Sequence, residues 1–272
     1  KPIDSENLIA VILRAQKEIE SAEKNERLFK VFKEHFSDNL QSARRQFVEN
    51  LLFRSGVFQN ADDLREAYPY GLLCMPLRDC VRIQSTSGTT GRRVIAFYTQ
   101  HDIDLWDATC ARAIVAAGGT PDDVVQVCYG YGLFTGGLGA HQGAGRLGAT
   151  VIPMSSGNTQ RQIMMMRELG TTVLCCTPSY ALYIGETLEK NHIPLSTIHL
   201  KAGLFGAEPW TDNMRREIER LLDIRAYDIY GLSEIAGPGV SYDCELQNGL
   251  HVCEDYFYPE VIDPDTLEPL PD

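Results

Sequence analysis

Residues 124–154, VVQVCYGYGLFTGGLGAHQGAGRLGATVIPM, hold a short apolar run at each end and a helix-length stretch between them. The runs VVQVCY and ATVIPM have the length and composition of buried strands, and residues 137–147 are long enough to form a helix. Two strands that are separated by a helix make a crossover unit, so this spacing predicts parallel strands in one sheet.

The same alternation extends in both directions along the chain. Strand-like runs begin near residues 81, 94, 171, 198 and 224, and they read VRIQS, VIAFYT, TTVLCCT, IHLKAGLFG and IRAYDIYG. Helical stretches are predicted near residues 102–117, 159–169, 179–190 and 211–222. We therefore predict an α/β fold with a mostly parallel sheet sandwiched by helices, in which ligands bind beyond the carboxyl ends of the strands.

The two ends of the chain differ from this central part. Apolar residues recur at three- and four-residue steps near the start, which predicts a helical N-terminal segment at 1–60. After Gly237, short β segments follow that are broken by turn residues. The predicted organisation is this helical segment, an α/β ligand-binding core at 61–237, and a β-rich segment at 238–272. The chain stops at EPLPD, within an expected hairpin turn, so a truncated β-rich subdomain is expected.

The composition argues against several classes of partner. The 272 residues carry 25 basic and 37 acidic side chains, which gives a formal charge of −12. Because a broad nucleic-acid surface needs clustered Lys and Arg, no nucleic-acid partner is expected. No apolar run approaches the roughly 20 residues of a membrane span, and the polar start does not resemble a signal peptide. The eight cysteines form no disulfide pattern, which favours a reducing cytoplasm.

The most distinctive loop is STSGTTGRR, residues 85–93, between two predicted strands. Its glycines, Gly88 and Gly91, permit a positive φ and a close approach of the backbone to a ligand. Successive N–H groups in such a turn bind anions, the hydroxyls add donors, and Arg92 and Arg93 add positive charge. The spacing is not that of the G-x-x-x-x-G-K-[ST] loop. The composition favours a phosphate-binding loop, and a plain Ser/Thr/Gly hairpin turn stays open as the alternative.

A second loop, YGYGLFTGG at residues 129–137, follows the VVQVC strand. Its aromatic residues alternate with glycines, so an aromatic acid or a base could stack on rings such as Tyr131 and Phe134. The loop ends where a helix is expected to start, so its free N–H groups could also receive an anion. The alternative is a glycine-rich turn in which the aromatic rings simply pack.

Two more segments, FGAEPW at 205–210 and DIYGLSE at 228–234, lie just past predicted strand ends. Tyr230 offers a ring on which a purine could stack, and Glu234 offers a hard oxygen for Mg²⁺. Acidic residues after strands are also often solvated or cap helices, so neither segment alone decides a function.

A third pattern, Cys244-x₆-His251-x-Cys253, lies in the β segments near the end of the chain. Thiolate and imidazole groups on adjoining β segments could hold Zn²⁺ in a structural site, which normally has four protein ligands. Two reduced cysteines and a surface histidine are the alternative.

The order of these loops resembles that of the adenylate-forming enzymes, and within them the phenylacetate–coenzyme A ligases. The resemblance runs from about residue 63 to residue 272, and its carriers include DLREAYPYGL, STSGTTGRR, YGYGLFTGGLG, LGATVIP, GNTQRQI, TVLCCTPSYAL, LFGAEPW, DIYGLSE, GPGVSYDC and GLHVCEDYFYPEVIDP. It implies the large domain of such an enzyme and a two-step reaction. An aryl acid, phenylacetate, reacts with MgATP to give an acyl-adenylate, and coenzyme A then displaces AMP to give phenylacetyl-CoA.

The resemblance also implies roles for individual residues. The β- and γ-phosphates would be held by Ser85, Thr86, Ser87, Gly88, Thr89, Gly91 and Arg92, and Mg²⁺ by Glu234 with help from Thr90. The adenosine would be bounded by Gly206, Ala207, Glu208, Pro209, Asp228, Tyr230 and Gly231. The aryl pocket would be formed by Tyr131, Phe134, Gly136, Ala207, Ile235, Ala236, Gly237 and Pro238.

The chain departs from the family pattern in three ways. Arg92 stands where the family usually has Lys, and a guanidinium meets phosphate with fork geometry instead of a point charge. The family continues beyond residue 272 to a ribose-binding Asp, a hinge and a lid domain whose Lys drives adenylation, so full ligase activity is not expected from these residues alone. A C-x-C pair of relatives, also beyond residue 272, could complete the zinc site, but Cys253 is not part of the family pattern. The alternative functions are a non-catalytic domain that binds a nucleotide or an acyl-adenylate, and a ligase for another aryl acid. The resemblance also implies a possible homodimer, because relatives in this family are often dimers.

Overall fold

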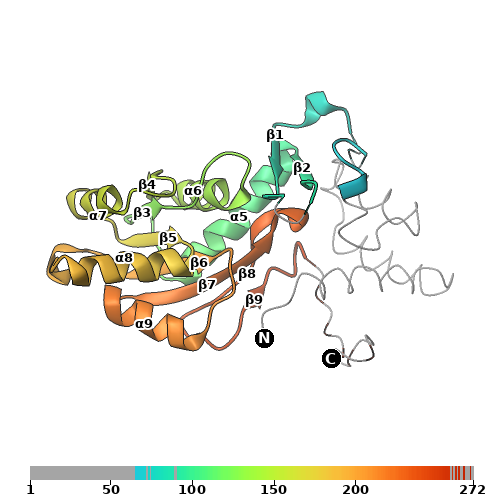
Figure 1. Cartoon of the computed structure of the whole chain (residues 1–272). Coiled ribbons are helices and arrows are strands. Elements are labelled where there is room, and N and C mark those ends of the chain that lie inside the picture. The colour runs from blue at the N-terminus through green and yellow to red at the C-terminus, as the bar shows by residue number, and fades with distance from the viewer. Residues whose placement is uncertain are drawn as a thin grey trace. The chain divides into compact units, whose positions relative to one another are not determined.

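The structure is a computed structural model, and it describes residues 65–71, 73, 75–88, 91–257, 259, 261, 263, 266 and 270 (Figure 1). The helical segment predicted at 1–60 lies outside the described residues, as do Thr89 and Thr90 of the predicted phosphate loop. The chain forms two compact units. Unit 1 consists of the residues up to Ile83, Ser87–Asp102 and the residues from Glu254 on, and unit 2 consists of Gln84–Thr86 and Ile103–Cys253. The predicted domain boundaries at residues 60 and 237 stay predictions.

Unit 2 is built on a seven-stranded sheet with the strand order β4-β3-β5-β6-β7-β8-β9. The first five strands in this order are parallel, and β8 and β9 continue the sheet in antiparallel pairing. The strands are β3 (Val124–Val127), β4 (Thr150–Ile152), β5 (Val173–Cys176), β6 (Ala202–Gly206), β7 (Arg225–Leu232), β8 (Gly237–Tyr242) and β9 (His251–Val252). The mostly parallel sheet predicted from the apolar runs is confirmed, and the β segments expected after Gly237 form its antiparallel end.

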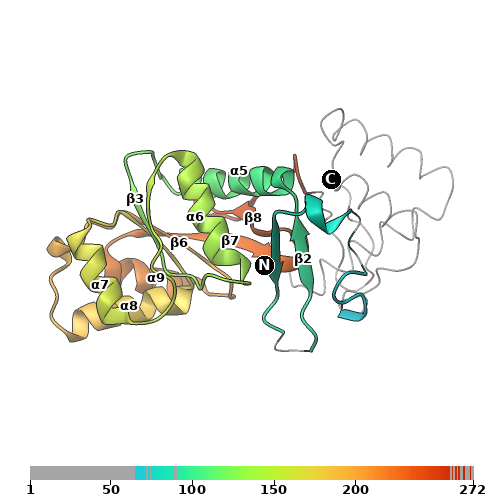
Figure 2. The ribbon, with the colours of Figure 1, turned by 90° about the horizontal axis from the view of Figure 1, so that it is seen from above.

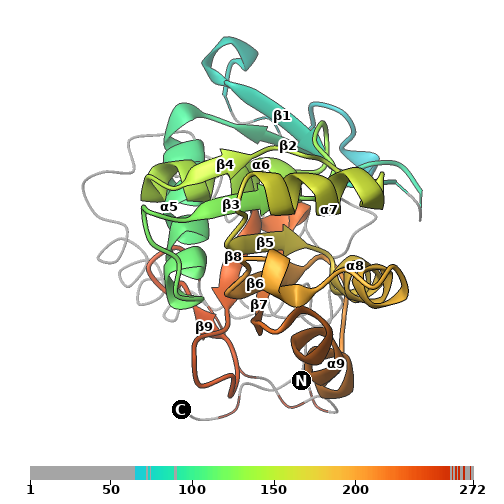
Figure 3. The same cartoon turned by 90° about the vertical axis from the view of Figure 1, so that its left-hand side faces the viewer.

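Helices cover both faces of this sheet, as predicted. One face packs against α5 (Gln100–Ala116) and α6 (Thr135–Leu147), with Ile114 and Ala144 fully buried against Val125 and Val127. The other face packs against α7 (Thr159–Glu168), α8 (Pro178–Lys190) and α9 (Asp212–Leu222). Figure 2 shows α7, α8 and α9 grouped away from α5 and α6, and Figure 3 shows α5 and α8 on opposite sides of the strands. No helix among the described residues is long and apolar enough to cross a membrane.

Local sequence explains where the helices begin. The side chains of Asn158, Thr177 and Thr211 accept hydrogen bonds from backbone N–H groups in the first turns of α7, α8 and α9. These are the residue types that cap helix N-termini best, and Pro178 supplies the fixed φ of a first helical position. Because each cap directly follows a sheet strand or its loop, the caps fix the point at which the chain leaves the sheet.

Unit 1 contains the 3₁₀ turn η1 (Leu77–Asp79) and the strand β2 (Ile95–Tyr98), which pairs with β1 (Arg82–Ser85) in a two-stranded sheet. Its residues Thr99 and Asp102 cap the start of α5 reciprocally: the Thr99 N–H donates to Asp102 at 2.9 Å, and the Asp102 N–H donates to the Thr99 hydroxyl at 3.2 Å.

The amino and carboxyl ends of the strands in the seven-stranded sheet have different surroundings. At the amino ends, which we call the amino edge of the sheet, the buried Asp123 carboxylate lies 2.8 Å from the Lys201 ammonium and accepts from the Thr172 hydroxyl at 2.8 Å. It also accepts from the backbone N–H and the hydroxyl of Thr120, at 2.7 and 2.9 Å. These residues precede β3, β5 and β6, so the Asp123 cluster ties together the starts of three strands.

At the carboxyl ends of the strands, which we call the carboxyl edge, the strand order changes direction between β3 and β5, and this is the topological switch point of the sheet. The two strands are neighbours, yet the helix that follows β3 lies on one face and the helix that follows β5 lies on the other. The connections therefore diverge and leave a crevice over the strand ends, which is where α/β sheets bind ligands.

Candidate functional site

An open cavity of about 360 Å³ lies at this switch point, and we call it the switch-point cavity. Its walls come from the end of β3 and the loop that follows, from the loop after β4, and from the first turns of α8. The lining residues are Cys128, Tyr129, Gly130, Phe134, Ser156, Gly157, Thr177, Ser179, Tyr180 and Tyr183. The volume falls at the lower end of the ~300–1,000 Å³ that small-molecule sites occupy.

The lining of the switch-point cavity is aromatic and uncharged. The rings of Tyr180 and Tyr183 are stacked with centroids 6.4 Å apart, and those of Tyr129 and Phe134 are also 6.4 Å apart. Burial raises the pKa of the Cys128 thiol to about 12 and the pKa of the Tyr129 hydroxyl well above its ordinary value, so both groups are neutral. A cavity of this kind fits a flat, uncharged group better than a phosphate.

The glycine-rich loop approaches the chain around it very closely. A Cβ atom on Gly137 would lie 2.6 Å from the Gly130 carbonyl oxygen, so only glycine fits there. The Tyr131 hydroxyl lies 3.2 Å from Nδ1 of His141, whose ring packs edge-on against the tyrosine ring. His141 therefore supports the loop from α6.

The start of the predicted phosphate loop is joined to this glycine-rich loop. The Ser85 N–H donates to the Leu133 carbonyl oxygen at 2.9 Å, and the buried Gln84 amide donates to the Phe134 carbonyl oxygen at 3.0 Å. Ser85 and Thr86 thus belong to unit 2 together with the cavity.

The described remainder of the phosphate loop, Ser87, Gly88, Gly91 and Arg92, belongs to unit 1. Gly88 and Gly91 have φ angles of 72° and 147°, which confirms the positive φ predicted for both glycines. The Gly91 N–H donates to the Gly88 carbonyl oxygen at 3.3 Å, and the side chain of Arg92 is exposed. The binding of phosphate by this loop stays a prediction.

The end of β6 and the loop after it contain the predicted adenosine residues 206–209. A Cβ atom on Gly206 would lie 2.1 Å from the Ile229 carbonyl oxygen, so the two strand ends touch here. Ala207 has a φ of 71°, which is unusual for a residue other than glycine, and Pro209 is exposed. The Glu208 carboxylate accepts a 2.6 Å hydrogen bond from the Ser179 N–H at the start of α8. Glu208 therefore links this loop to a wall of the switch-point cavity.

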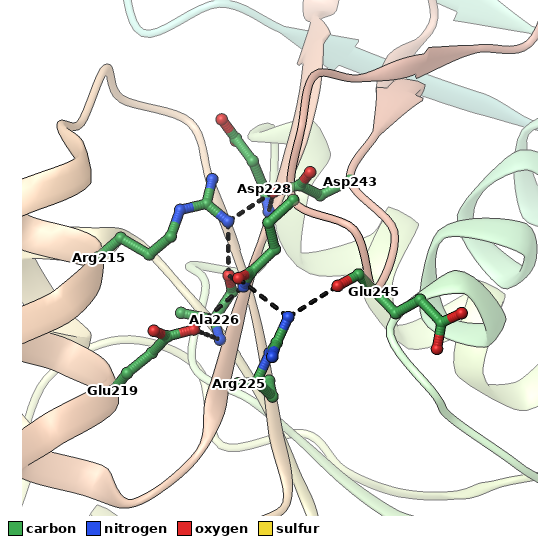
Figure 4. A network of polar contacts seen from close by, with 8 residues as sticks. Arg215, Glu219, Arg225, Ala226, Asp228, Asp243 and Glu245 are labelled. Atoms are coloured by element: carbon green, nitrogen blue, oxygen red, sulfur yellow. Dashed lines mark hydrogen bonds and ion pairs between the residues drawn. The ribbon is translucent and has the colours of Figure 1, made fainter.

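Asp228, on β7, lies beside a polar network that is shown in Figure 4. Arg215 donates to Asp243 at 2.6 Å and to the Ala226 carbonyl oxygen at 2.8 Å, and its guanidinium lies 4.7 Å above the Trp210 ring. Burial raises the pKa of Asp228 to about 6, against a hydrogen bond from Trp210 and the charge of Arg215 that act in the other direction. The Asp228 carboxyl group can therefore change its charge near neutral pH.

The end of β7 and the loop after it hold the remaining predicted residues. Tyr230 and Gly231 lie in β7, where the pairing with β8 shifts register, and a Cβ atom on Gly231 would lie 2.0 Å from the Gly237 carbonyl oxygen. The 3₁₀ turn η3 (Ser233–Ile235) follows, and Ala236 ends it with a φ of 81°. Glu234 is exposed, and no hydrogen bond or ion pair joins its carboxylate to another described residue.

This loop contacts the start of α6, which carries Gly136. The Thr135 and Ser233 hydroxyls lie 3.3 Å apart, and the Trp106 indole donates to the Pro238 carbonyl oxygen at 2.8 Å. A Cβ atom on Gly237 would lie 2.6 Å from the Trp106 ring. The predicted aryl-pocket residues Gly136 and 235–238 are therefore brought together, while Phe134 faces the switch-point cavity.

The zinc site proposed for Cys244, His251 and Cys253 stays a prediction. No group of three or more His, Cys, Asp or Glu side chains within them is placed to hold a metal ion. Cys253 is buried beside Cys110 in the core, whereas His251 is exposed and packs near Tyr242. Cys253 and His251 therefore lie in different surroundings, one in the core and the other at the surface.

Several cavity residues were not predicted from the sequence. Tyr180 and Tyr183 follow the end of β5 in the segment TPSYALY, and Ser156 and Gly157 follow β4. Their position just past strand ends is the signal that could have found them, because every loop at this edge borders the same crevice.

The fold and the site together define a class: an α/β protein with a neutral aromatic cavity at the carboxyl ends of its parallel strands. The chain belongs to the AMP-binding enzyme family, whose model matches residues 9–272. This membership confirms the resemblance to adenylate-forming enzymes noted from the sequence motifs.

Relatives with curated descriptions match most of this chain. It is 52% identical over 216 residues to a phenylacetate–coenzyme A ligase of Pseudomonas putida, covering 79% of this chain and 49% of the relative. It is 52% identical over 212 residues to the phenylacetate–coenzyme A ligase of Escherichia coli, covering 77% of this chain and 48% of that one. The chain spans about half the length of the curated relatives that it matches.

Solved structures match the fold. A 2-hydroxyisobutyryl-CoA ligase in complex with its acyl-adenylate, 2-HIB-AMP, and CoA in the thioesterification state aligns with a TM-score of 0.70 at 26% identity, covering 84% of this chain and 53% of that one. An open conformation of the same ligase aligns with a TM-score of 0.70 at 24% identity. The predicted large-domain fold is confirmed by these likenesses.

Proposed function

We propose that this chain forms the ATP- and acid-binding part of a ligase that activates an aryl acid, phenylacetate, and transfers the acyl group to coenzyme A. The observation that carries the proposal is the neutral aromatic cavity at the sheet edge that also bears loops 206–210 and 231–238, in a chain 52% identical to phenylacetate–coenzyme A ligases. The aryl group would occupy the switch-point cavity next to Phe134, with Tyr131, Gly136, Ala207 and residues 235–238 around its carboxyl end.

In the first step, a carboxylate oxygen of the acid attacks the α-phosphorus of ATP, and the bond to pyrophosphate breaks. In the second step, the coenzyme A thiolate attacks the acyl carbon, and the bond to AMP breaks. Phosphoryl and acyl transfers of this kind need positioning and charge neutralisation more than a protein nucleophile. The predicted holders of the phosphates are the hydroxyls, glycine N–H groups and Arg92 guanidinium of residues 85–92.

The adenosine would lie against the loops after β6 and β7. Gly206, Ala207, Glu208 and Pro209 would line it on one side, and Asp228, Tyr230 and Gly231 on the other. The closeness of Gly206 to the Ile229 carbonyl oxygen supports this, because it places the two loops side by side. An ionised Asp228 would accept a hydrogen bond from an amino group, so binding would weaken as the pH falls through about 6.

Glu234 fits a role in holding Mg²⁺. Its carboxylate is exposed on η3 and has no partner among the described residues, so a hard oxygen is available to the ion. Thr90 is its predicted helper. When bound, Mg²⁺ would neutralise phosphate charge, and the residues of the chain would orient the acid and the nucleotide.

The first test is calorimetric titration of the 272-residue chain with a non-hydrolysable phenylacetyl-adenylate analogue. We expect binding at one site, and weaker binding of AMP and of an acetyl-adenylate analogue, because both lack the aryl group. A folded chain that binds none of the three would refute the proposal. Pyrophosphate release on adding ATP and phenylacetate separates turnover from binding alone.

A further inference from the structure

A buried chain of side-chain amides runs from the sheet to the loop that walls the switch-point cavity. Gln126, in the middle of β3, and Gln162, on α7, are both almost completely buried. The Thr171 hydroxyl donates to Oε1 of Gln126 at 2.7 Å, and Nε2 of Gln126 donates to Oε1 of Gln162 at 2.8 Å. Nε2 of Gln162 then donates to the carbonyl oxygens of Ser155 and Gly157, at 2.7 and 3.2 Å.

Each polar atom of these two amides is satisfied in one orientation. Nε2 of Gln162 faces two carbonyl oxygens, so it must be the donor end, and Oε1 of Gln162 accepts from Gln126 and from the Cys128 thiol at 3.1 Å. A carboxylate here would face two acceptors, and a hydrophobic residue would remove the Gln162 donor from both carbonyl oxygens. The site therefore requires an amide at position 162.

The loop that this amide holds has an unusual backbone. Ser155, Gly157 and Asn158 all have positive φ angles, of 64°, 86° and 49°. Residues in such conformations keep them only when their surroundings fix them. Here the fixing groups are Gln162 from inside and, from α8, the Tyr180 hydroxyl, which donates to the Gly157 carbonyl oxygen at 3.4 Å.

The same loop connects to the glycine-rich loop on the other side of the cavity. The Ser155 hydroxyl accepts from the Tyr131 N–H at 3.4 Å, and Ser156 and Gly157 line the cavity opposite Gly130. Gln162 thus holds the loop at 155–158, and the Ser155 hydroxyl links that loop to the glycine-rich loop.

We propose that Gln162 is a positioning residue for the acyl group: through the carbonyl oxygens of residues 155 and 157 and the Ser155 hydroxyl, it sets the shape of the switch-point cavity. The inference rests on the proposed function, since it takes the aryl group of the substrate as the occupant of that cavity. It gives a role to the segment GNTQRQI, residues 157–163, to which no nucleotide- or acid-binding role was assigned from the sequence.

The test compares two variants of the whole chain on the same helix. Gln162→Met keeps the volume of the side chain and removes its hydrogen bonds, and Met166→Ala removes buried volume one turn further on without touching the cavity. Each variant is titrated with the phenylacetyl-adenylate analogue and with AMP, and its stability is measured by urea unfolding. We expect Gln162→Met to bind the analogue at least about tenfold more weakly while AMP binding stays within about twofold, because AMP lacks the acyl group.

Met166→Ala is expected to lose stability and to keep the ratio of the two affinities. If folded Gln162→Met binds the analogue as tightly as the wild type, or loses analogue and AMP equally, the inference is wrong. If Gln162→Met does not fold, Ser155→Ala decides: it keeps the amide chain and removes only the acceptor for the Tyr131 N–H, and an unchanged affinity for the analogue overturns the proposal. A wild-type chain that binds neither probe refutes the proposed function itself, and this inference with it.

Discussion

Replacing Asp228 by Asn should stabilise the folded protein at neutral pH. The carboxyl group is largely buried beside Asp243, and burial raises its pKa to about 6 from an ordinary value of 3.8. Asparagine keeps an acceptor for the hydrogen bond from Trp210 and removes the charge that burial opposes. The substitution therefore removes the free-energy cost of burying a charge and leaves most of the local contacts.

The size of the effect follows from the two pKa values. Below pH 3.8 the carboxyl is neutral in both the folded and the unfolded chain, so its full contribution to stability is present. As the pH rises towards 6 the unfolded chain ionises while the folded one does not, and stability falls by up to about 3 kcal/mol, at 1.36 kcal/mol for each pH unit between the pKa values. Partial exposure reduces this loss, so Asp228→Asn should gain about 1–3 kcal/mol at pH 8 and almost nothing near pH 4.

Urea unfolding of both proteins at pH 4, 6 and 8 measures this difference. With a slope of about 2–3 kcal/mol per molar urea, the midpoint of the variant should exceed that of the wild type by roughly 0.3–1.5 M at pH 8. Asp122→Asn is the control, because Asp122 is exposed and this substitution removes one charge that is not buried. The reasoning fails if the gain from Asp228→Asn is the same at all three pH values, or if Asp122→Asn shows the same pH dependence.

Three further changes test other parts of the molecule. Glu234→Gln should weaken Mg²⁺-dependent ATP binding about tenfold and leave AMP binding nearly intact, as measured by calorimetry with and without Mg²⁺, and an equal loss of both nucleotides would point to a structural role. Although burial opposes ionisation of Asp123, hydrogen bonds from Lys201, Thr172 and Thr120 lower its pKa, so Asp123→Asn should cost about 1–3 kcal/mol at pH 7. That cost should shrink as the pH falls through the lowered pKa, and a cost that persists in acid would contradict this account. In α6, a Cβ atom on Gly145 would meet nothing within 4 Å, so Gly145→Ala should raise the free energy of unfolding by about 0.5–1 kcal/mol. A Cβ atom on Gly143 would lie 2.5 Å from Cys110, so Gly143→Ala should lower it by about 1–3 kcal/mol. Thermal unfolding ranks the two, and the reverse order would refute the packing argument.

Much of the fold could be predicted because its strands are buried on both faces. Such strands read as continuous apolar runs, and β5, with four fully buried residues, is the clearest case. Caps such as Thr177 and Thr211 set the helix starts close to the predicted ones. The strand order, and the antiparallel pairing of β8 and β9 on the same sheet, depend on contacts between distant segments that no local pattern reports.

The candidate site was predicted in part for the same reason. Loops at the carboxyl ends of parallel strands are found once the strands are found, which led to residues 129–137, 206–210 and 228–238. Gln162 was not found, because a glutamine on an amphipathic helix normally faces water, and its burial appears only when α7 packs over β3. The zinc site stays a prediction, because spacing along a strand does not say which of its residues are buried.

The Asp123 cluster lies at the amino edge of the sheet, and the ligand loops leave from the carboxyl edge. A lineage that adapts to heat or acidity can therefore vary Thr120, Thr172 and Lys201 without altering the groups that would select the substrate. Selection on the stability of the fold and selection on the choice of substrate then act on different positions, and each can proceed with little effect on the other.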